Sequence, residues 1–253
     1  MTGHSTTSVQ QFQLFIDGES VPAASGETIP IVDSATEETF AEVAAGGEAD
    51  IDRAVAAADE STAEWLGMSP PERGRVLNRA AELIREEKES LAELLTRENG
   101  KPISQARTEV EVGARYFEYY AGATDKIQGE TIPLGREYVD FTIREPLGVT
   151  GHIVPWNFPV SLFARSVAPS LAAGNAAVVK SAEQTPLTSV ELGKLLDEAG
   201  VPDGTINVVP GYGAEAGAAL TDHAAINAIA FTGSVPTGKE VAASAARQLK
   251  HVH

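Results

Sequence analysis

The sequence predicts an α/β fold with a doubly wound, mostly parallel sheet. From residue 149 onward, short apolar runs alternate with helical patterns and short loops, which is typical of parallel strands joined by helical crossovers. With 253 residues, 43% of them hydrophobic, the chain can bury a sizeable core. We expect strands at 149–154, 176–180, 206–209 and 228–231, and helices that begin near Pro159, Pro186 and Gly213 and after Ser234.

The amino-terminal part is predicted to form short strands. Residues 1–10 are polar and lack an apolar core, so we expect a disordered leader of a cytoplasmic protein. Asp17-Gly18, flanked by the segments 12–16 and 19–22, is a strong hairpin signal. Two further strands are expected at 28–32 and 39–43.

Three helical stretches follow these strands. Asp50 is expected to cap the first, and Ser69-Pro70 opens the second. The second helix, or its continuation, ends at Asn99-Gly100, and the third covers 103–123. The tyrosines of the third stretch are predicted to pack rather than to contact a ligand: Tyr116, Tyr119 and Tyr120. Beyond it, 135–143 alternates polar and apolar residues like an exposed hairpin, whose apolar face needs a cover from this chain or another subunit.

Charge and composition exclude several classes of partner. The formal net charge is −17, from 19 basic and 36 acidic residues, so binding to nucleic acid or to an anionic membrane is disfavoured. No stretch is apolar over the length that a membrane-spanning helix needs, about 20 residues. The acidic surface suggests adaptation to high salt, as in a halophilic protein, with ordinary acidity as the alternative.

Neither a thiol site nor a metal site is predicted. Cysteine is absent from the 253 residues, which removes disulfides, thiolate ligands and thiol nucleophiles. The five histidines are not spaced with one another, or with carboxylates, as metal ligands are.

The most informative stretch is 153–159, Ile-Val-Pro-Trp-Asn-Phe-Pro. Pro155 ends the strand, and Pro159 suits the first turn of the next helix. Asn157 is therefore held at a strand-to-helix junction, where α/β proteins place ligands. The alternative is a rigid turn whose Asn satisfies its own backbone.

Two further strand ends carry polar groups. Lys180 ends its strand and Glu183 follows three residues later, so the pair can hold a ribose, and the carboxylate would favour NAD over NADP. A surface lysine beside a helix-entry glutamate is the alternative. At the other end, the turn Phe231-Thr232-Gly233-Ser234 precedes a helix whose N-terminus can receive a phosphate, although an ordinary serine cap explains the same residues.

The glycines after residue 210 give a weaker signal. Gly211, Gly213 and Gly217 follow a strand and open a helix, which is typical of dinucleotide-binding turns. Their spacing differs from that of the usual fingerprint, so the motif carries little weight alone.

Taken together, these segments resemble the amino-terminal half of the aldehyde dehydrogenase superfamily in their order and spacing. The resemblance runs from about Phe12 to His253 and includes 98–102, 144–149, 155–159, Lys180 with 183–186, 207–213, and 231–234 with Gly238. It implies a Rossmann-like NAD(P)-binding domain formed by 11–123 and 147–253, and an oligomerisation hairpin at 124–146. A homodimer or homotetramer is then expected.

The resemblance also implies an activity, the NAD(P)-dependent oxidation of an aldehyde to a carboxylic acid. In the family, a cysteine thiolate attacks the aldehyde, a hydride leaves for the nicotinamide, and water activated by a glutamate hydrolyses the thioester. Asn157 matches the oxyanion-hole amide. The matching cofactor residues are Ile153, Pro155, Trp156, Lys180, Glu183, Gly213, Gly217, Phe231, Thr232, Gly233 and Ser234, with NAD as the expected cofactor and NADP as the alternative.

The sequence departs from the family pattern in three places. Ser181 replaces the proline that usually follows the ribose-binding lysine, which removes no contact, and the other two departures limit the expectation. Arg165 matches a position that faces the substrate tunnel, where a guanidinium would clamp the carboxylate of a semialdehyde; an aromatic aldehyde is the other substrate class, and a salt bridge is the alternative role for Arg165. Neither the nucleophilic cysteine nor the general-base glutamate lies in these residues. We therefore expect the catalytic domain to be missing and the chain to be inactive alone, either as half of an aldehyde dehydrogenase or as a non-catalytic nucleotide-binding or assembly module.

Overall fold

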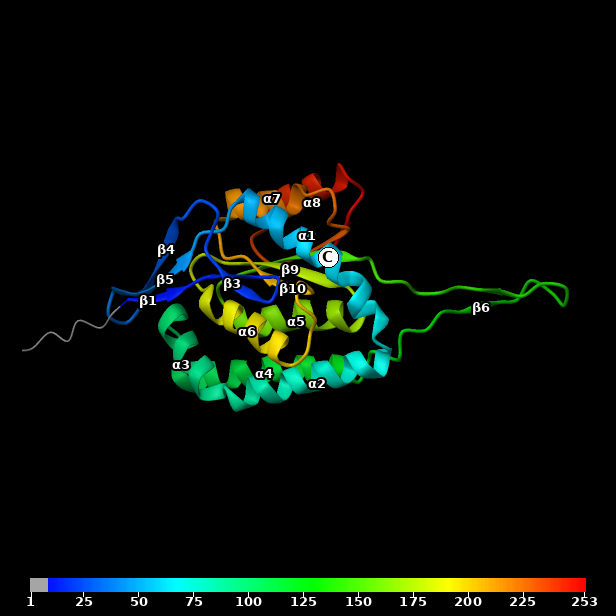
Figure 1. Ribbon diagram of the computed structural model, residues 1–253, viewed down its shortest axis with the longest axis horizontal. Coiled ribbons are helices and arrows are strands. Elements are labelled where there is room, and N and C mark those ends of the chain that lie inside the picture. The colour runs from blue at the N-terminus through cyan, green and yellow to red at the C-terminus, as the bar shows by residue number, and fades with distance from the viewer. Residues whose placement is uncertain (1–8) are drawn as a thin grey trace, which may run out of the picture.

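The computed structural model describes residues 9–253, and its centre is a seven-stranded sheet (Figure 1). Five strands run parallel: β8 (Val149–Val154), β9 (Ala176–Ser181), β10 (Ile206–Val208), β11 (Ala228–Phe231) and β12 (His251–Val252). The hairpin β2 (Leu14–Ile16) and β3 (Glu19–Val21) extends the sheet antiparallel to β10, in the order β12-β11-β8-β9-β10-β2-β3. The doubly wound, mostly parallel sheet is confirmed, and its four predicted parallel strands agree to within one residue.

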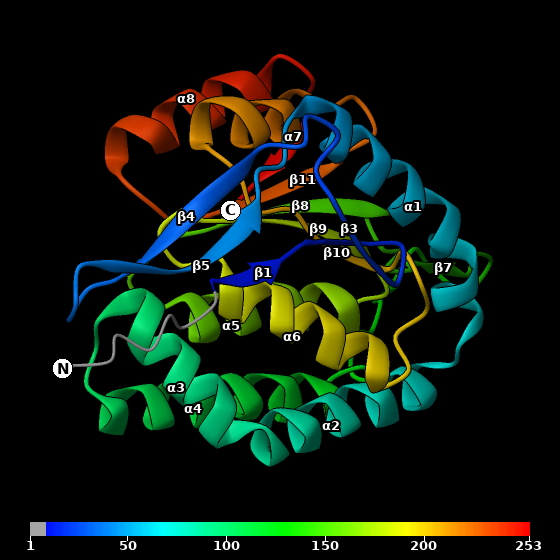
Figure 2. The same cartoon turned by 60° about the vertical axis from the view of Figure 1, so that its left-hand side comes forward.

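Helices cover both faces of this sheet (Figures 1 and 2). The connections α5 (Pro159–Ala172) and α6 (Leu187–Glu198) lie on one face, whereas α7 (Ala218–Asp222), α8 (Val235–Ala246) and α1 (Glu48–Gly67) lie on the other. A π-helical turn, Gly213–Gly217, leads into α7. The chain therefore changes direction between the neighbouring strands β8 and β11, which is the switch point where such sheets bind ligands.

The alternation of side chains along β9 shows why the sheet needs both layers. Ala176 and Val178 belong to the core under α1 and α7, and Ala177 and Val179 belong to the core above α5 and α6. Successive residues of a strand point to opposite faces, so a run of apolar residues is buried on both.

A second helical layer packs beneath α5 and α6. It consists of α2 (Pro70–Glu86), α3 (Lys88–Asn99) and α4 (Ile103–Ala121). The part that ends at Asn99 is thus a separate helix, α3, which follows the one that Ser69-Pro70 opens. The predictions for the tyrosines of α4 differ in outcome: Tyr116 and Tyr120 pack against the core, but Tyr119 is 71% exposed.

Corrections are needed at the amino terminus. Most of the predicted leader lies outside the described residues, but Gln10 is already part of β1 (Gln10–Phe12), which pairs with β5 (Glu38–Ala44) in a small sheet completed by β4 (Thr28–Asp33). Phe12 is thus not part of the predicted hairpin. Asp50 does not cap α1 either, because it is the third helical residue and accepts a hydrogen bond from the Gly47 N–H at 3.1 Å.

The predicted hairpin at 135–143 is a ribbon that projects from the body of the protein (Figure 1). Its two strands are β6 (Thr131–Ile132) and β7 (Asp140–Phe141), so one strand begins before the predicted segment. Val139 and Ile143 are 90% and 72% exposed, so within residues 9–253 nothing covers the apolar side chains of this ribbon.

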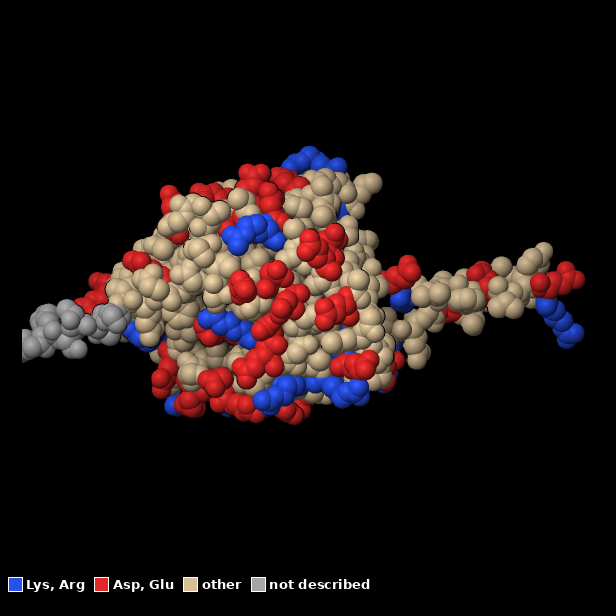
Figure 3. Space-filling model, in the orientation of Figure 1, with Lys and Arg blue, Asp and Glu red and all other residues tan. Residues whose placement is uncertain are grey.

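The distribution of charged side chains on the surface agrees with the negative net charge of the sequence. Acidic side chains are spread over the face seen in Figure 3, and basic side chains form smaller groups between them. Among the described residues, no helix is long and apolar enough to cross a membrane.

A buried histidine joins the central strand to the helix beneath it. His152 on β8 lies with Nδ1 2.6 Å from Ser166 Oγ and Nε2 2.9 Å from Thr150 Oγ1. Since the Thr150 hydroxyl donates to the Ala176 carbonyl at 2.8 Å, it accepts from Nε2, and Nδ1 accepts from Ser166. Burial lowers the pKa of His152 from 6.5 to about 4, so the ring is neutral in the folded protein.

This histidine predicts a loss of stability in mild acid. Between pH 6.5 and 4 the unfolded chain binds a proton that folded His152 does not, so the free energy of unfolding falls as pH falls, by up to about 3 kcal/mol from this group. His152→Gln removes the titration. Urea unfolding of both proteins from pH 7 to pH 4 measures the difference, and parallel pH profiles would contradict the assignment.

Candidate functional site

The loop between β8 and α5, residues 155–158, is held through its backbone. We call it the Asn157 loop. The Trp156 carbonyl accepts hydrogen bonds from Asn99 Nδ2 at 2.7 Å and Thr185 Oγ1 at 3.3 Å, and the Asn157 carbonyl accepts one from Lys101 Nζ at 3.1 Å. The Asn157 side chain is exposed and has no hydrogen-bond partner within residues 9–253. Its amide is therefore free to donate to a ligand.

Two buried glutamates close the N-termini of the helices below the sheet. Glu109 Oε1 accepts from the N–H groups of Val160 and Ser161, at 3.0 and 3.2 Å, in the first turn of α5. Glu98 accepts from the N–H groups of Leu187 and Thr188, at 2.7 and 3.1 Å, at the start of α6. These N–H groups are already paired with carboxylates, so neither helix start offers a site for an external anion.

The environment of Glu98 opposes its ionisation. Burial raises its pKa to about 7, and the hydrogen bonds from Thr188 and Leu187 counteract only part of this effect.

The N-terminus of α8 is different because no carboxylate closes it. Ser234 Oγ accepts from the Thr237 N–H at 3.3 Å, whereas the N–H groups of Gly233, Ser234 and Val235 have no acceptor within residues 9–253. All three residues are exposed. This helix start can therefore receive a phosphate through free N–H groups and the helix dipole.

Three predicted residues form a row across the carboxyl ends of adjacent strands. Ile153 on β8 is the register partner of Phe231 on β11 and of Lys180 on β9. Thr232, the residue after Phe231, extends the pairing of β11 with β8, because its N–H donates to the Ile153 carbonyl at 3.2 Å. The two strand ends at the switch point are thus fixed to one another.

A groove of about 550 Å³ opens beside this row, on the side of α7 and α8. Ile153, Phe231, Gly213 and Gly217 line it, together with α8 residues such as Val241. The other predicted cofactor residues do not line it: Pro155, Trp156, Lys180, Glu183, Thr232, Gly233 and Ser234. Four of the predicted residues therefore meet in one hollow, and the rest lie on the strand ends and loops of the carboxyl edge.

Lys180 and Glu183 form an ion pair at the end of β9. Lys180 Nζ lies 3.2 Å from Glu183 Oε2, with the lysine buried and the glutamate half-buried. Burial lowers the pKa of Lys180. Burial also acts to raise the pKa of Glu183, but hydrogen bonds and the Lys180 charge outweigh it and lower that pKa, so a carboxylate faces the edge.

The glycines after residue 210 differ in the space that a side chain would have. A Cβ on Gly211 would lie 2.4 Å from the Gly46 carbonyl oxygen, so this glycine permits two backbone segments to approach each other. A Cβ on Gly213 or Gly217 would meet no atom within 4 Å, and both residues lie in the π-helical turn along the groove.

Arg165 lies on α5 and is exposed. Its guanidinium donates to Thr232 Oγ1 at 3.4 Å. No carboxylate within residues 9–253 forms the salt bridge that the sequence offered as an alternative, so the charge of Arg165 faces solvent beside the switch point.

No local sequence pattern indicated roles for the residues that hold the Asn157 loop. Asn99 is the last residue of α3, Lys101 lies in the short segment between α3 and α4, and Glu109 lies on α4. One signal was present for Glu109: it follows Ala106 and precedes Gly113 and Phe117 at helical spacing, which puts a carboxylate on a buried stripe. For Asn99 and Lys101, only their place in the family motif marked them.

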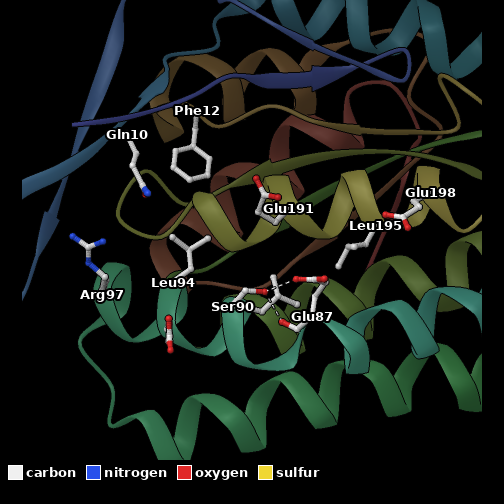
Figure 4. A pocket seen from close by; sticks show the side chains of 11 residues that line it. Gln10, Phe12, Glu87, Ser90, Leu94, Arg97, Glu191, Leu195 and Glu198 are labelled. Atoms are coloured by element: carbon white, nitrogen blue, oxygen red, sulfur yellow. Dashed lines mark hydrogen bonds between the residues drawn. The ribbon is translucent and has the colours of Figure 1, made fainter. Parts of the chain in front are cut away.

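A second hollow, of about 460 Å³, lies between β1, α3 and α6 (Figure 4). Several of its polar groups are already paired. Glu87 accepts from the Ser90 hydroxyl at 2.6 Å within the hollow, while Glu191 accepts from Lys194 at 2.8 Å and Arg97 donates to Asp33 at 3.4 Å, both partners outside its lining. It contains none of the predicted site residues, so the carboxyl edge is the better candidate.

The sheet and its switch point are those of a dinucleotide-binding α/β protein. Residues 21–253 match the family model described as "Aldehyde dehydrogenase family". The chain belongs to the aldehyde dehydrogenase family.

The proteins that are similar in sequence and structure are longer than this chain. It is 51% identical over 241 residues to aldehyde dehydrogenase family 2 member B4 of Arabidopsis thaliana, covering 94% of this chain and 45% of that protein. Benzaldehyde dehydrogenase of Antirrhinum majus is 46% identical, with 92% and 44% covered. The NAD+ complex of an aldehyde dehydrogenase from Bacillus cereus superimposes with a TM-score of 0.94 at 42% identity, covering 96% of this chain and 50% of that one. The chain thus spans about half the length of these relatives.

The packing of Phe231 predicts a sensitive glycine. A Cβ on Gly233 would lie 2.6 Å from the end of the half-buried Phe231 ring, so Gly233→Ala forces that ring to move and destabilises the fold by about 1 kcal/mol. Gly213→Ala is the matched control on the same groove, and its expected effect is within about 0.5 kcal/mol. Urea unfolding of both variants checks this, and equal effects would contradict it.

Proposed function

We propose that this chain binds NAD+ at the carboxyl edge of its sheet and provides the cofactor-binding part of an aldehyde oxidation. The observation that carries the proposal is the row Phe231–Ile153–Lys180 beside a helix start with free N–H groups. The Bacillus cereus relative, which was solved as an NAD+ complex, supports the choice of cofactor.

The residues present fit the parts of a dinucleotide. Glu183 is ionised and would accept hydrogen bonds from the adenosine ribose hydroxyls, with Lys180 beside it. Gly233 and Ser234 would bind the pyrophosphate through free N–H groups, because α5 and α6 are closed by Glu109 and Glu98. The Glu183 carboxylate would repel a 2′-phosphate, which supports NAD over NADP.

The remaining predicted residues would surround the same ligand. Ile153, Phe231, Gly213 and Gly217 line the groove and offer an apolar wall and room for the adenosine end. Pro155, Trp156 and Thr232 lie toward the nicotinamide end in this proposal, next to Asn157. When bound, the nicotinamide supplies the acceptor for a hydride.

Asn157 would act as one donor of an oxyanion hole. Its backbone is fixed, its amide is free, and it stands at the switch point, so it can donate to the oxygen of an aldehyde as charge develops there. Cysteine is absent from the 253 residues, so a thiol nucleophile would have to come from outside this sequence.

The substrate class rests on Arg165. Its exposed guanidinium supports an aldehyde that carries a carboxylate, such as a semialdehyde. An aromatic aldehyde is the second candidate, favoured by similarity to a benzaldehyde dehydrogenase.

The projecting ribbon supports self-association. Its apolar side chains are exposed at β6 and β7, so we propose that it packs on another copy in a homodimer or homotetramer.

A non-catalytic nucleotide-binding module is the second candidate function. The same strand ends and free helix N-terminus would serve it, because such a module needs no nucleophile. In either case the 253-residue chain is proposed to bind the cofactor without oxidising an aldehyde, and NADH formation from an aldehyde by this chain alone would contradict both.

The test is NAD+ binding by calorimetry with a matched pair of variants. Glu183→Ala removes a charged hydrogen-bond acceptor, so we expect Kd for NAD+ to rise at least about tenfold and the preference over NADP+ to fall. Glu191→Ala is the control, because Glu191 pairs with Lys194 at the same three-residue spacing but lies at the second hollow. No binding by the unchanged chain, or equal effects of both variants, would refute the proposal.

A further inference from the structure

Lys101 is a buried cation that contacts three groups at once. Its side chain is only 8% exposed, and its Nζ binds the Glu109 carboxylate and the Asn157 carbonyl. The same ammonium lies 4.5 Å from the centre of the Phe158 ring. A buried charge is unfavourable unless it is paired, so these contacts hold the lysine in one place.

Glu109 extends this contact into the next helix. Its side chain is 3% exposed; Oε2 binds Lys101, and Oε1 accepts from the Val160 and Ser161 N–H groups. One ion pair thus joins α4 to both the Asn157 loop and the first turn of α5. Buried ion pairs contribute little net stability compared with apolar residues of the same volume, so their geometric effect is the informative one.

The two carbonyls that flank Asn157 Cα are both held. Asn99 donates to the Trp156 carbonyl and Lys101 to the Asn157 carbonyl. Each carbonyl fixes the plane of its peptide, and two fixed planes determine the φ and ψ angles of the residue between them. The direction of the Asn157 Cα–Cβ bond follows, while its amide remains free.

We propose that Lys101, with Glu109 as its buried partner and Asn99 beside it, is a positioning residue that fixes the direction of the Asn157 amide. This inference rests on the proposed role of Asn157 as an oxyanion donor. In the proposed function the outer helical layer contacts neither cofactor nor substrate. Through Asn157 it would still control the position of the donor that faces the reacting oxygen.

The loop contains its own reporter. The chain has two tryptophans: Trp65 is fully buried, and Trp156, next to Asn157, is 58% exposed. Acrylamide quenching of tryptophan fluorescence therefore reports mainly on Trp156. The measurement needs neither cofactor nor aldehyde, so its failure leaves the proposed function untouched, and failure of NAD+ binding leaves this measurement valid.

The test compares Lys101→Met with Lys194→Met in the 253-residue chain. Both changes remove a lysine that pairs with a glutamate and faces an aromatic ring, but Lys194 is near Phe12, away from the loop. Releasing the Asn157 carbonyl should raise the quenching constant of Trp156 at least about twofold in Lys101→Met, with far-UV circular dichroism unchanged and no change in Lys194→Met. An unchanged constant in Lys101→Met, or an equal rise in both variants, would overturn the proposal.

A second variant covers the case in which Lys101→Met fails to fold because Glu109 is left unpaired. Lys101→Met/Glu109→Gln removes that charge and keeps an acceptor for the Val160 and Ser161 N–H groups. A folded double variant with raised quenching supports the proposal. One without raised quenching, or one that also fails to fold, overturns it, since the pair would then act on the whole fold and not on the loop.

Discussion

Two buried carboxylates determine which part of the carboxyl edge is open to a ligand. Glu98 and Glu109 lie on the outer helical layer. Their side chains accept hydrogen bonds from the first N–H groups of α6 and α5, respectively. Helix starts at the end of parallel strands are ordinarily sites for anions. With two of them closed from within, the start of α8 is the helix start with free N–H groups that the proposed function uses for the phosphate, and the groove beside it is proposed to hold the rest of the dinucleotide.

The same outer layer supports the Asn157 loop. The loop begins with the proline that follows β8, and two of its carbonyls, those of Trp156 and Asn157, accept from Asn99 at the end of α3 and from Lys101 just after it. Polar contacts to the backbone leave the side chain free, which is the arrangement a donor of an oxyanion hole requires. Fold and proposed chemistry are thus connected through hydrogen bonds between segments more than fifty residues apart in sequence.

The sequence predicted those features that local patterns determine. The short buried runs of β8 and β9 and the stripe of buried residues at helical spacing in α4 are local patterns that follow directly from burial. Features that depend on distant partners were missed or misplaced. Phe12 looked like part of a hairpin, but it belongs to β1, which pairs with β5 about thirty residues later. Lys101 gave no local signal, since its partners lie on another helix and another loop. The carboxyl-edge residues could be proposed because strand ends and their turns can be recognised in the sequence, and the family resemblance joined them.

The central claim is that a dinucleotide occupies the switch point between β8 and β11. Hydrogen–deuterium exchange of the 253-residue chain with and without NAD+ tests it directly. The account predicts slower exchange in 153–158, 180–184 and 231–238 when NAD+ is present. Unchanged exchange in these segments, or slowing confined to 87–97 and 191–198 around the second hollow, would contradict it.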